Sequence, residues 1–295
     1  IKKFMFNNKT ILITGGTGSF GKKIIKRILS DYKPKKVIIY SRDELKQYNL
    51  QKELIKYSKQ TRYFIGDVRD HSRLKKSLQR VNYVIHAAAL KHVSAAEYNP
   101  FEAVKTNVIG TQNVVDASLE MGVEKIISLS TDKASSPVNL YGATKLTADK
   151  LVVSGNYHKG NVKTKLSVVR YGNVFGSRGS IVPYLINFDK KKQFPITDIN
   201  MTRFSITLND SIDFVLNCLK KMWGGEIFVP KIPSYKLVDL ASALLKNNNT
   251  KIVGLRPGEK IHEEMISVND SVNTMELKDS YVICPNQELI EWNRE

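Results

Sequence analysis

The chain has 295 residues, of which 42% are hydrophobic, so it can build a packed core and is not expected to be disordered. No run approaches the roughly 18 apolar residues that a membrane-spanning helix needs. The net charge of +18 permits nucleic-acid binding, but the lysines are spread along the whole chain and not gathered in one stripe. We therefore expect solvated basic faces that attract an anionic substrate, and neither nucleic acid nor a membrane as partner.

The cysteines and histidines suggest neither a disulfide nor a metal site. Cys218 and Cys284 lie far apart without motif spacing, and the five histidines show no metal-ligand spacing. We expect free thiols in a reducing compartment and no bound metal. The basic residues 1–6 run directly into a strand pattern without a cleavable apolar stretch, which favours a cytoplasmic protein without a secretory leader.

Short apolar runs alternate with helical patterns through the first half of the chain. Apolar residues recur at helical spacing in residues 20–29, and residues 45–57 carry a second helical pattern. The apolar runs that we predict to be strands are residues 10–14, 37–40, 63–65, 84–86, 125–130 and 166–171. Strands this apolar must be covered on both faces, which predicts an α/β fold with a parallel, doubly wound sheet.

The alternation of strand and helix patterns ends after about residue 175. Loops that contain glycine, proline and serine appear there, with short helical segments between them. We predict two domains: residues 1–175 carry the doubly wound sheet, and residues 176–295 form a smaller, mixed α/β lobe that binds the substrate. The chain is expected to cross between the two.

A glycine-rich turn joins the first predicted strand to the first predicted helix. Its glycines follow the spacing Gly15-x-x-Gly18-x-x-Gly21, in the strand-turn-helix context that a dinucleotide-binding Rossmann domain requires. Glycines let the backbone approach a pyrophosphate, and the helix N-terminus offers unpaired N–H groups and a positive dipole end. The cofactor contacts predicted in this turn are Gly15, Thr17, Gly18, Ser19, Phe20 and Gly21.

The end of the second predicted strand indicates which dinucleotide is bound. An NAD site usually carries an acid there for the ribose hydroxyls. This chain has Ser41 and Arg42 instead, with Lys46 one turn further on. A hydroxyl and two cations suit a 2′-phosphate and predict NADP. In the alternative, Asp43 binds the ribose and Arg42 is simply solvated.

Two further strand ends complete the predicted cofactor site. Asp67 and Val68 follow the third strand, where a carboxylate can accept a hydrogen bond from the adenine amino group. Ala87 and Ala88 follow the fourth strand, and their small side chains leave room for the cofactor backbone.

Tyr141 and Lys145 are the candidate redox pair. Their i, i+4 spacing puts both side chains on one helix face, directly after a predicted strand of the dinucleotide-binding unit. Lys145 can hold the nicotinamide ribose and lower the pKa of the phenol, so that a tyrosinate takes the proton of a sugar hydroxyl. The alternative for such a common spacing is a pair of ordinary surface residues.

Several segments together resemble one known family. They are Tyr40–Lys46, His86–His92, Ser130–Ala134, Arg170–Val174, Met201–Phe204 and Arg256–Lys260. With the glycine turn, they resemble the extended short-chain dehydrogenase/reductases over nearly the whole chain. More narrowly, the chain resembles the inverting, 5-epimerising UDP-N-acetylglucosamine 4,6-dehydratases, which make precursors of pseudaminic-acid-type sugars.

The resemblance implies how the catalytic residues divide the work. NADP, Tyr141 and Lys145 oxidise C4 of UDP-N-acetylglucosamine with Thr131 at the ketone oxygen, Lys133 takes the C5 proton, and Asp132 helps the C6 hydroxyl leave as water. The hydride then returns to C6, and C5 is reprotonated from the opposite face. A lysine base must be neutral, and we expect burial and neighbouring positive charge, from Lys145 and the oxidised nicotinamide, to keep it so.

The resemblance also assigns further contacts with bound ligands. It adds Lys91 and Val174 to the cofactor site. It gives the UDP-sugar to Lys91, Thr131, Asn173, Arg178, Gly179, Ser180, Ile181, Val182, Thr197, Arg256 and Glu259. Arginines can form paired hydrogen bonds with pyrophosphate oxygens, and Glu259 can accept one from a hydroxyl or an amide.

Two other functions are compatible with the sequence. A UDP-sugar 4-epimerase or a retaining 4,6-dehydratase would use the same scaffold, although Tyr141 argues against the membrane-linked retaining relatives, which tend to carry Met there. A non-catalytic nucleotide- or nucleic-acid-binding Rossmann protein is disfavoured by the complete catalytic set.

Extended family members also commonly pair through the helix that bears the tyrosine and its neighbour. We predict a homodimer or a larger even homo-oligomer, with the apolar stretch 104–119 as the neighbouring helix.

Overall fold

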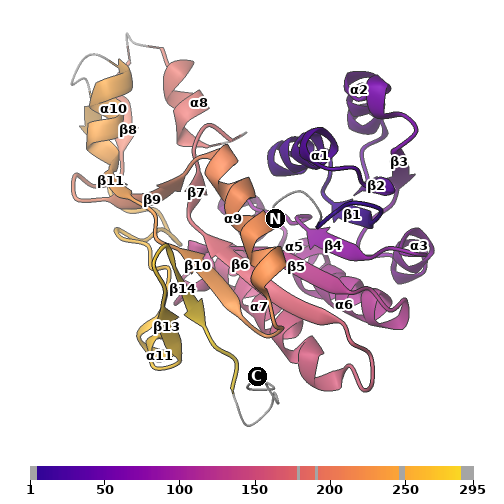
Figure 1. Ribbon diagram of the computed structural model, residues 1–295. Helices are drawn as coiled ribbons and strands as arrows, with labels where there is room; N and C mark the ends of the chain where they lie inside the picture. Colours follow the sequence, from indigo (N-terminus) through magenta and orange to yellow (C-terminus); the bar gives the residue numbers. More distant parts are fainter. Residues whose placement is uncertain (1–4, 178–179, 190–191, 246–249, 287–295) are drawn as a thin grey trace.

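The computed structural model describes residues 5–177, 180–189, 192–245 and 250–286, and its central element is a nine-stranded sheet (Figure 1). The strands of this sheet are β1 (Thr10–Thr14), β2 (Lys36–Ser41), β3 (Thr61–Ile65), β4 (Tyr83–His86), β5 (Lys125–Thr131), β6 (Lys165–Tyr171), β10 (Ile227–Pro230), β13 (Thr274–Glu276) and β14 (Ser280–Ile283). They lie in the order β13-β14-β10-β6-β5-β4-β1-β2-β3. The chain therefore starts at the centre and winds outward in both directions, as a Rossmann sheet does.

All six predicted strands lie in this sheet, and the doubly wound α/β fold is confirmed. Neighbouring strands from β3 through β10 pair in parallel. At one edge, beyond the predicted strands, β14 runs antiparallel to both β10 and β13. The connection between β13 and β14 is too short for the crossover that parallel pairing of these two strands would require.

Helices cover both faces of the sheet. The α-helices are α1 (Ser19–Asp31), α2 (Glu44–Glu53), α3 (His71–Ser77), α4 (Val93–Tyr98), α5 (Pro100–Val104), α6 (Gly110–Glu120), α7 (Leu140–His158), α8 (Ile181–Ile186), α9 (Leu208–Lys221), α10 (Leu237–Leu245) and α11 (Val268–Ser271). Within the described residues there are also two 3₁₀ turns, η1 (Ile55–Tyr57) and η3 (Asp132–Ala134), and one π-helical turn, η2 (Lys105–Ile109). Helices α1 and α9 pack together on one face, whereas α3, α6 and α7 pack on the other (Figure 1).

The second half of the chain divides between the large sheet and a small lobe. Strands β10, β13 and β14 belong to the large sheet, and helix α9 packs on it. The chain therefore returns from the small lobe to the large sheet after residue 175. The small lobe contains β7 (Asn173–Val174), β9 (Thr202–Ile206), β11 (Ser234–Lys236), β8 (Phe194–Ile196) and β12 (Thr250–Ile252). It has a core of its own between α8, β8 and α10. The two-domain division at residue 175 stays a prediction.

None of the helices within the described ranges combines the length and apolarity that crossing a bilayer requires.

The apolar stretch 104–119 does not present one continuous face to a partner. Val114 and Val115 are 1% and 2% exposed, because they pack inside the core of their own chain, and Val115 lies against Gly155 of α7. Val104, Val108 and Leu119 of the same stretch are only partly buried, and the expectation that this helix pairs with a partner stays a prediction. The apolar side chains exposed on this part of the chain are Tyr98, Phe101 and Ile109.

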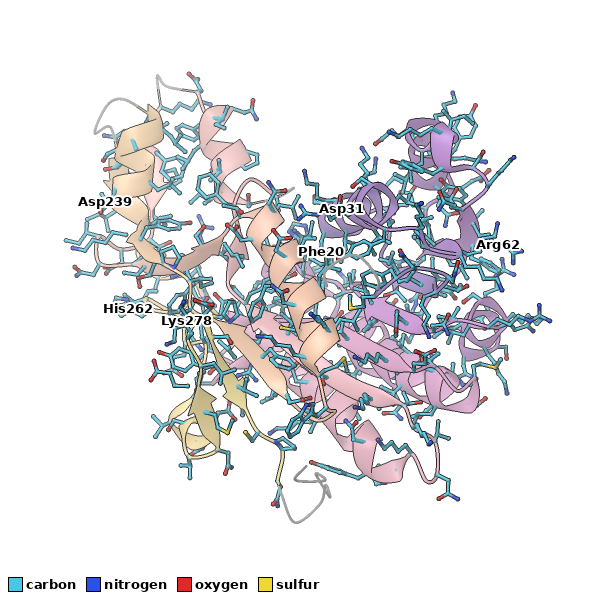
Figure 2. The ribbon with its side chains drawn as sticks, in the orientation of Figure 1. Phe20, Asp31, Arg62, Asp239, His262 and Lys278 are labelled. Atoms are coloured by element: carbon cyan, nitrogen blue, oxygen red, sulfur yellow. The ribbon has the colours of Figure 1, made fainter. Side chains whose placement is uncertain are left out.

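Basic side chains are spread over the surface. Figure 2 labels Arg62 on β3 and Lys278 beside β14, which are both exposed and lie on opposite sides of the molecule. Lys22 and Lys26 both pair with Glu53, at 2.9 and 2.6 Å. The positive charge of this chain is thus dispersed and partly neutralised by local ion pairs.

Candidate active site

One large cleft, of about 1230 Å³, lies at the carboxyl ends of the central strands. It extends from the glycine turn after β1 to the small lobe, where Thr197, Arg256 and Glu259 line it. Except for Asp132, every predicted site residue within the described ranges lines this cleft. Arg178 and Gly179, predicted for the sugar nucleotide, lie outside the described residues.

The glycine turn forms a cradle that a side chain would fill. Gly15 has a φ of +64°, and a Cβ there would lie 2.8 Å from the carbonyl oxygen of Ala87. A Cβ at Gly21 would lie 2.6 Å from the carbonyl oxygen of Gly15. Gly18 precedes α1 without a side-chain cap, so N–H groups in the first helical turn stay available to a ligand. This close backbone approach and these donors fit a dinucleotide pyrophosphate.

Some side chains at the end of β2 already form hydrogen bonds and ion pairs within the chain. Asp43 caps α2: its carboxylate accepts from the Lys46 backbone N–H at 2.8 Å and pairs with the Lys46 ammonium at 2.6 Å. Lys46 is therefore less free for a phosphate than the sequence suggested. Ser41 is buried and accepts from Gln47 at 3.0 Å, whereas the side chain of Arg42 is 54% exposed at the edge of the cleft. Arg42 is the cation best placed to reach a ligand at this strand end.

Asp67 already accepts hydrogen bonds within the chain. Its Oδ2 lies 2.7 Å from Nη2 of Arg69 and 3.4 Å from Nη1 of Arg42. Burial opposes ionisation of Asp67, but the hydrogen bonds from Arg69 outweigh it and lower the pKa of this carboxyl. A charged Asp67 is thus available at the adenine end, and its contact with adenine stays a prediction.

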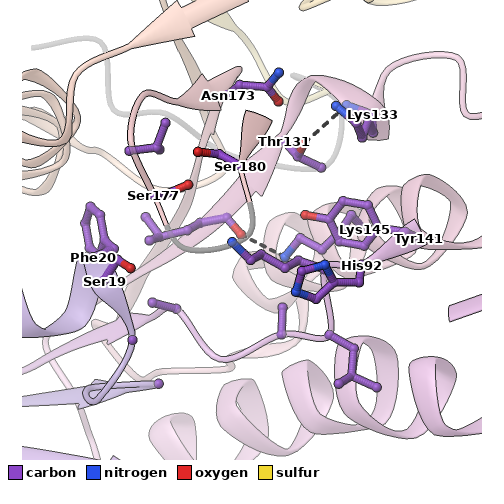
Figure 3. A pocket seen from close by; sticks show the side chains of 18 of the residues that line it. Ser19, Phe20, His92, Thr131, Lys133, Tyr141, Lys145, Asn173, Ser177 and Ser180 are labelled. Atoms are coloured by element: carbon purple, nitrogen blue, oxygen red, sulfur yellow. Dashed lines mark hydrogen bonds between the residues drawn. The ribbon is translucent and has the colours of Figure 1, made fainter. Parts of the chain in front are cut away.

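The Tyr141–Lys145 pair lies at the start of α7, on the opposite side of the cleft from Ser19 and Phe20 (Figure 3). Asn139 caps this helix by accepting from the Gly142 N–H at 2.8 Å. The ammonium of Lys145 donates to the Leu129 carbonyl oxygen at 2.7 Å. Burial lowers the pKa of Lys145, and the charge of Asp149 opposes this shift. The pair lies in the cleft and not on an outer surface.

The expected lowering of the Tyr141 pKa is wrong for the protein without ligands. Burial raises the pKa of Tyr141, and the charges of Asp132 and Asp149 raise it further, while a hydrogen bond with Thr131 acts in the opposite direction. Lys145 is directed to a backbone carbonyl, so it does not offset these effects. The chain alone therefore favours the neutral phenol.

The turn after β5 brings together Thr131, predicted at the ketone oxygen, with Asp132 and Lys133, predicted for elimination. Thr131 donates its hydroxyl proton to Oδ1 of Asp132 at 2.9 Å, and the Lys133 ammonium donates to the same oxygen at 3.1 Å. Asp132 is completely buried, whereas the side chain of Lys133 is 20% exposed to the cleft. In Figure 3, Thr131 and Lys133 face the same space as Tyr141.

The surroundings of Lys133 differ from the expected cluster of positive charge. Its Nζ forms ion pairs with two carboxylates, Asp132 at 3.1 Å and Glu263 at 3.2 Å. Glu263 was not predicted as a site residue. It is 130 positions away in the sequence, and no local motif relates it to Lys133. Only the folded chain shows that this buried carboxylate belongs to the site.

The loop that carries Glu263 is fastened to the turn after β5 and to the small lobe. Asn139 donates to the Gly258 carbonyl oxygen, and Lys260 donates to that of Ser135, both at 2.8 Å. Arg203 of β9 donates to the carbonyl oxygen of Ile261 at 3.0 Å. This loop therefore holds the small lobe against the predicted catalytic turn.

Asn107 is a second residue that sequence reasoning missed. It lies in η2, and its amide donates to the Leu90 carbonyl oxygen at 2.9 Å while its Oδ1 accepts from the Leu90 N–H at 2.8 Å. It also donates to the Thr144 hydroxyl at 3.1 Å. π-helical turns are frequent at functional sites. Here the turn fixes the loop that carries Ala87, Ala88 and Lys91, which all line the cleft.

Thr197, Arg256 and Glu259 form the far wall of the cleft, and the other predicted sugar-nucleotide residues line it nearer the large sheet. Thr197 donates to Oε2 of Glu259 at 3.1 Å, and the Arg256 guanidinium lies 3.9 Å from Oε1 of the same carboxylate. The side chain of Arg256 is 63% exposed. The other predicted sugar-nucleotide residues that line the cleft within the described ranges are Lys91, Thr131, Asn173, Ser180, Ile181 and Val182.

With this geometry in place, comparison with known proteins identifies the family. Residues 11–285 match the family described as polysaccharide biosynthesis protein, and the chain belongs to this family. It is 57% identical over 289 residues to a UDP-N-acetylglucosamine 4,6-dehydratase (inverting) of Campylobacter jejuni subsp. jejuni serotype O:23/36 (strain 81-176), covering 97% of this chain and 86% of that protein. It is 41% identical to a UDP-glucose 4-epimerase of Rickettsia rickettsii (strain Sheila Smith), covering 95% and 84%.

Solved structures agree with this assignment of the fold. The X-ray structure of Pen from Bacillus thuringiensis has a TM-score of 0.91 and 42% identity, covering 96% of this chain and 91% of that one. The dTDP-glucose 4,6-dehydratase DesIV from Streptomyces venezuelae, with NAD and TYD bound, has a TM-score of 0.76 and 21% identity, covering 87% and 88%. At this low identity, DesIV supports the fold alone.

Replacing Gly21 by Ala should weaken dinucleotide binding more than tenfold. The added Cβ would meet the backbone of Gly15 and Gly16 at 2.6 Å and push the turn out of the shape that admits a pyrophosphate. Fluorescence titration with reduced nicotinamide dinucleotide measures the affinity. Gly122→Ala is the control, because Gly122 has a φ of +66° but open space around its Cβ position. Equal affinities for Gly21→Ala and wild type would contradict the cradle.

Proposed function

We propose that this protein is an inverting UDP-N-acetylglucosamine 4,6-dehydratase. The observation that carries the proposal is the juxtaposition of an acid-base turn, Thr131–Lys133, with the Tyr141–Lys145 pair in one cleft. The 57% identity to the Campylobacter jejuni enzyme over nearly the whole chain supports the same reaction and substrate. A 4-epimerase also requires Tyr141, Lys145 and a hydroxyl such as that of Thr131, but it does not require Asp132 and Lys133.

In this function, the chain first oxidises the sugar. A nicotinamide dinucleotide bound in the glycine cradle supplies the acceptor and later the donor of hydride. Tyr141 takes the proton of the C4 hydroxyl, with Thr131 at the oxygen and Lys145 at the nicotinamide ribose. Because the surrounding protein favours the neutral phenol, Tyr141 must lose its proton first. The rate of C4 oxidation should therefore rise with pH.

Elimination follows at the neighbouring turn. A C4 ketone acidifies the C5–H bond, Lys133 takes the C5 proton as a neutral amine, and the C5 electron pair forms the C5=C6 double bond. The C6–O bond breaks as Asp132 protonates the departing hydroxyl, which leaves as water. The distance of 3.1 Å between Lys133 Nζ and Asp132 Oδ1 allows one proton shift to convert their ion pair into this amine and acid.

The UDP part of the substrate belongs against the far wall of the cleft. We assign its pyrophosphate to Arg256, whose exposed guanidinium can form paired hydrogen bonds with phosphate oxygens, and to the described part of the 178–182 segment. Glu259 orients Arg256 and has a further lone pair for a hydroxyl or an amide. Asn173 and Lys91 line the cleft between this wall and the catalytic turn.

We infer NADP as the dinucleotide. The support is Arg42, an exposed cation at the end of β2, beside Ser41. Asp43, which would have to bind the ribose in an NAD site, instead caps α2. A guanidinium at this place suits a 2′-phosphate.

Arg42→Ala should weaken NADP by roughly 10- to 100-fold, as expected for a lost charged hydrogen bond, and NAD much less. Isothermal titration with each dinucleotide measures the two affinities. Arg62→Ala, a change of an exposed arginine on β3 away from the cleft, is the matched control and should alter neither. Equal losses for NADP and NAD would rule out this role of Arg42.

Two substitutions should separate the two halves of the reaction. Tyr141→Phe should lower C4 oxidation by roughly 10²–10⁴-fold while UDP-sugar binding persists. Lys133→Met removes the titrating amine, so reduced nicotinamide should accumulate while no water is lost and C5–H does not exchange with deuterium. Absorbance of the reduced cofactor, together with mass spectrometry and NMR in deuterated water, reports both halves. Dehydration by Lys133→Met at a near-normal rate would exclude Lys133 as the base.

The second candidate function is a UDP-sugar 4-epimerase, which the 41% identity to the Rickettsia rickettsii protein favours. Product mass distinguishes the two, because only dehydration removes water. A wild-type product with the mass of the substrate and an inverted C4 would overturn the dehydratase assignment.

We also propose an even homo-oligomer that pairs through α7, which carries Tyr141, and the neighbouring stretch 104–119, with α4 and α5 beside them. Tyr98 and Phe101 are 87% and 63% exposed there, and a partner that packs against this region would cover them. Light scattering should give at least twice the chain mass of 33.4 kDa. Phe101→Glu should shift the protein to the monomer, whereas Val268→Glu, at an 82% exposed valine of α11, should not. A wild-type monomer at micromolar concentration would contradict the proposal.

A further inference from the structure

The Lys133 ammonium is bound from two sides by carboxylates that come from distant parts of the chain. Asp132 precedes Lys133 in η3, whereas Glu263 comes from the loop between β12 and α11. Both N–O distances, 3.1 and 3.2 Å, are those of direct ion pairs. Asp132 is 0% and Glu263 8% exposed, so neither carboxylate is a surface group.

Both carboxylates keep one oxygen without a partner. Oδ2 of Asp132 and Oε2 of Glu263 are buried and accept no hydrogen bond within the part of the chain that the structure describes. A buried carboxylate that served stability alone would be fully hydrogen-bonded, because an unpaired buried acceptor is unfavourable. Unpartnered buried groups of this kind point to a functional role.

Three basic side chains that contact the same loop or its neighbours are directed to backbone carbonyl oxygens. Lys260 donates to the Ser135 carbonyl oxygen, Arg203 to that of Ile261, and Arg170 to that of Met265. Within the described residues, Lys133 is the cation that forms an ion pair with Glu263. The ion pair therefore restrains the orientation of both side chains.

We propose that Glu263 is the positioning residue of the elimination base, on the assumption that the dehydratase function holds. One proton passes from Nζ of Lys133 to Asp132, which leaves an amine and a carboxylic acid. The amine still donates an N–H to Glu263, which fixes the direction of its lone pair toward the sugar. When Nζ takes the C5 proton and Asp132 gives its own to the departing hydroxyl, the Glu263 carboxylate stabilises the new ammonium. This base-orienter arrangement follows the general logic of catalytic triads.

The test compares Glu263→Gln with wild type and with Glu264→Gln. Gln has the size of Glu and keeps an acceptor oxygen, so it removes the charge with little change in packing. Glu264 is the matched control, because it is the adjacent residue, is exposed and only accepts from Ser136. UDP-N-acetylglucosamine is the probe, and the reaction is followed in deuterated water by cofactor absorbance and by NMR of C5.

Glu263→Gln should leave KM and the rate of C4 oxidation within about threefold of wild type and slow C5 exchange and water loss by roughly 10- to 100-fold. Glu263→Asp, which restores the charge on a shorter side chain, should recover part of the loss. In a Lys133→Met background, Glu263→Gln should change residual C5 exchange no further. Glu264→Gln should resemble wild type in every measurement.

Other outcomes overturn the inference. Water loss at the wild-type rate in Glu263→Gln would exclude a role in the base. A joint loss of C4 oxidation and substrate affinity would assign Glu263 to packing. If Glu263→Gln does not fold, as judged by thermal unfolding, Glu263→Asp decides the question by the same split between C4 oxidation and C5 exchange. A wild-type protein that inverts C4 without losing water would overturn the dehydratase function as well, whereas a dehydrating wild type that Glu263→Gln matches overturns this inference alone.

Discussion

Parallel pairing of β1, β4, β5 and β6 determines where the functional groups of this protein meet. Parallel strands end at the same edge of the sheet, so the glycine turn after β1, the alanine loop after β4 and the catalytic turn after β5 all open into one cleft. Helices on both faces bury the strands and leave this edge accessible. The small lobe supplies the opposite wall, and a cofactor and a sugar nucleotide can therefore face each other across it.

The ion pairs of Lys133 connect this edge to the C-terminal part of the chain. Glu263 reaches the catalytic turn from a loop that Asn139, Lys260 and Arg203 fasten on both sides. The surroundings of Lys133 thus depend on the docking of the small lobe as well as on the sheet. Lys145, in contrast, is held by the Leu129 carbonyl oxygen within β5.

The sequence was sufficient wherever function depends on local pattern. Apolar runs predicted the first six strands, the glycine spacing predicted the cradle, and the Tyr-x-x-x-Lys spacing predicted a pair on one face of α7. It was insufficient where distant segments meet. The contact of Glu263 with Lys133 spans 130 positions, and the antiparallel strand β14 and the burial of Val115 depend on tertiary packing. The raised pKa of Tyr141 likewise follows from burial, which helical spacing does not reveal.

The π-helical turn η2 lies within a continuous helical segment, residues 100–120, and changes the direction in which the following side chains point. One additional residue in a turn rotates everything that follows by about 100° relative to a regular α-helix. The two ends can therefore face different neighbours: Phe101 points to solvent, Asn107 grips the loop at Leu90, and Val114 enters the core. Deleting one residue here would produce a more regular helix, yet it would turn either the amide or the valine away from its target. The π-helical turn thus allows one helical segment to place side chains at the surface, at the cleft and in the core.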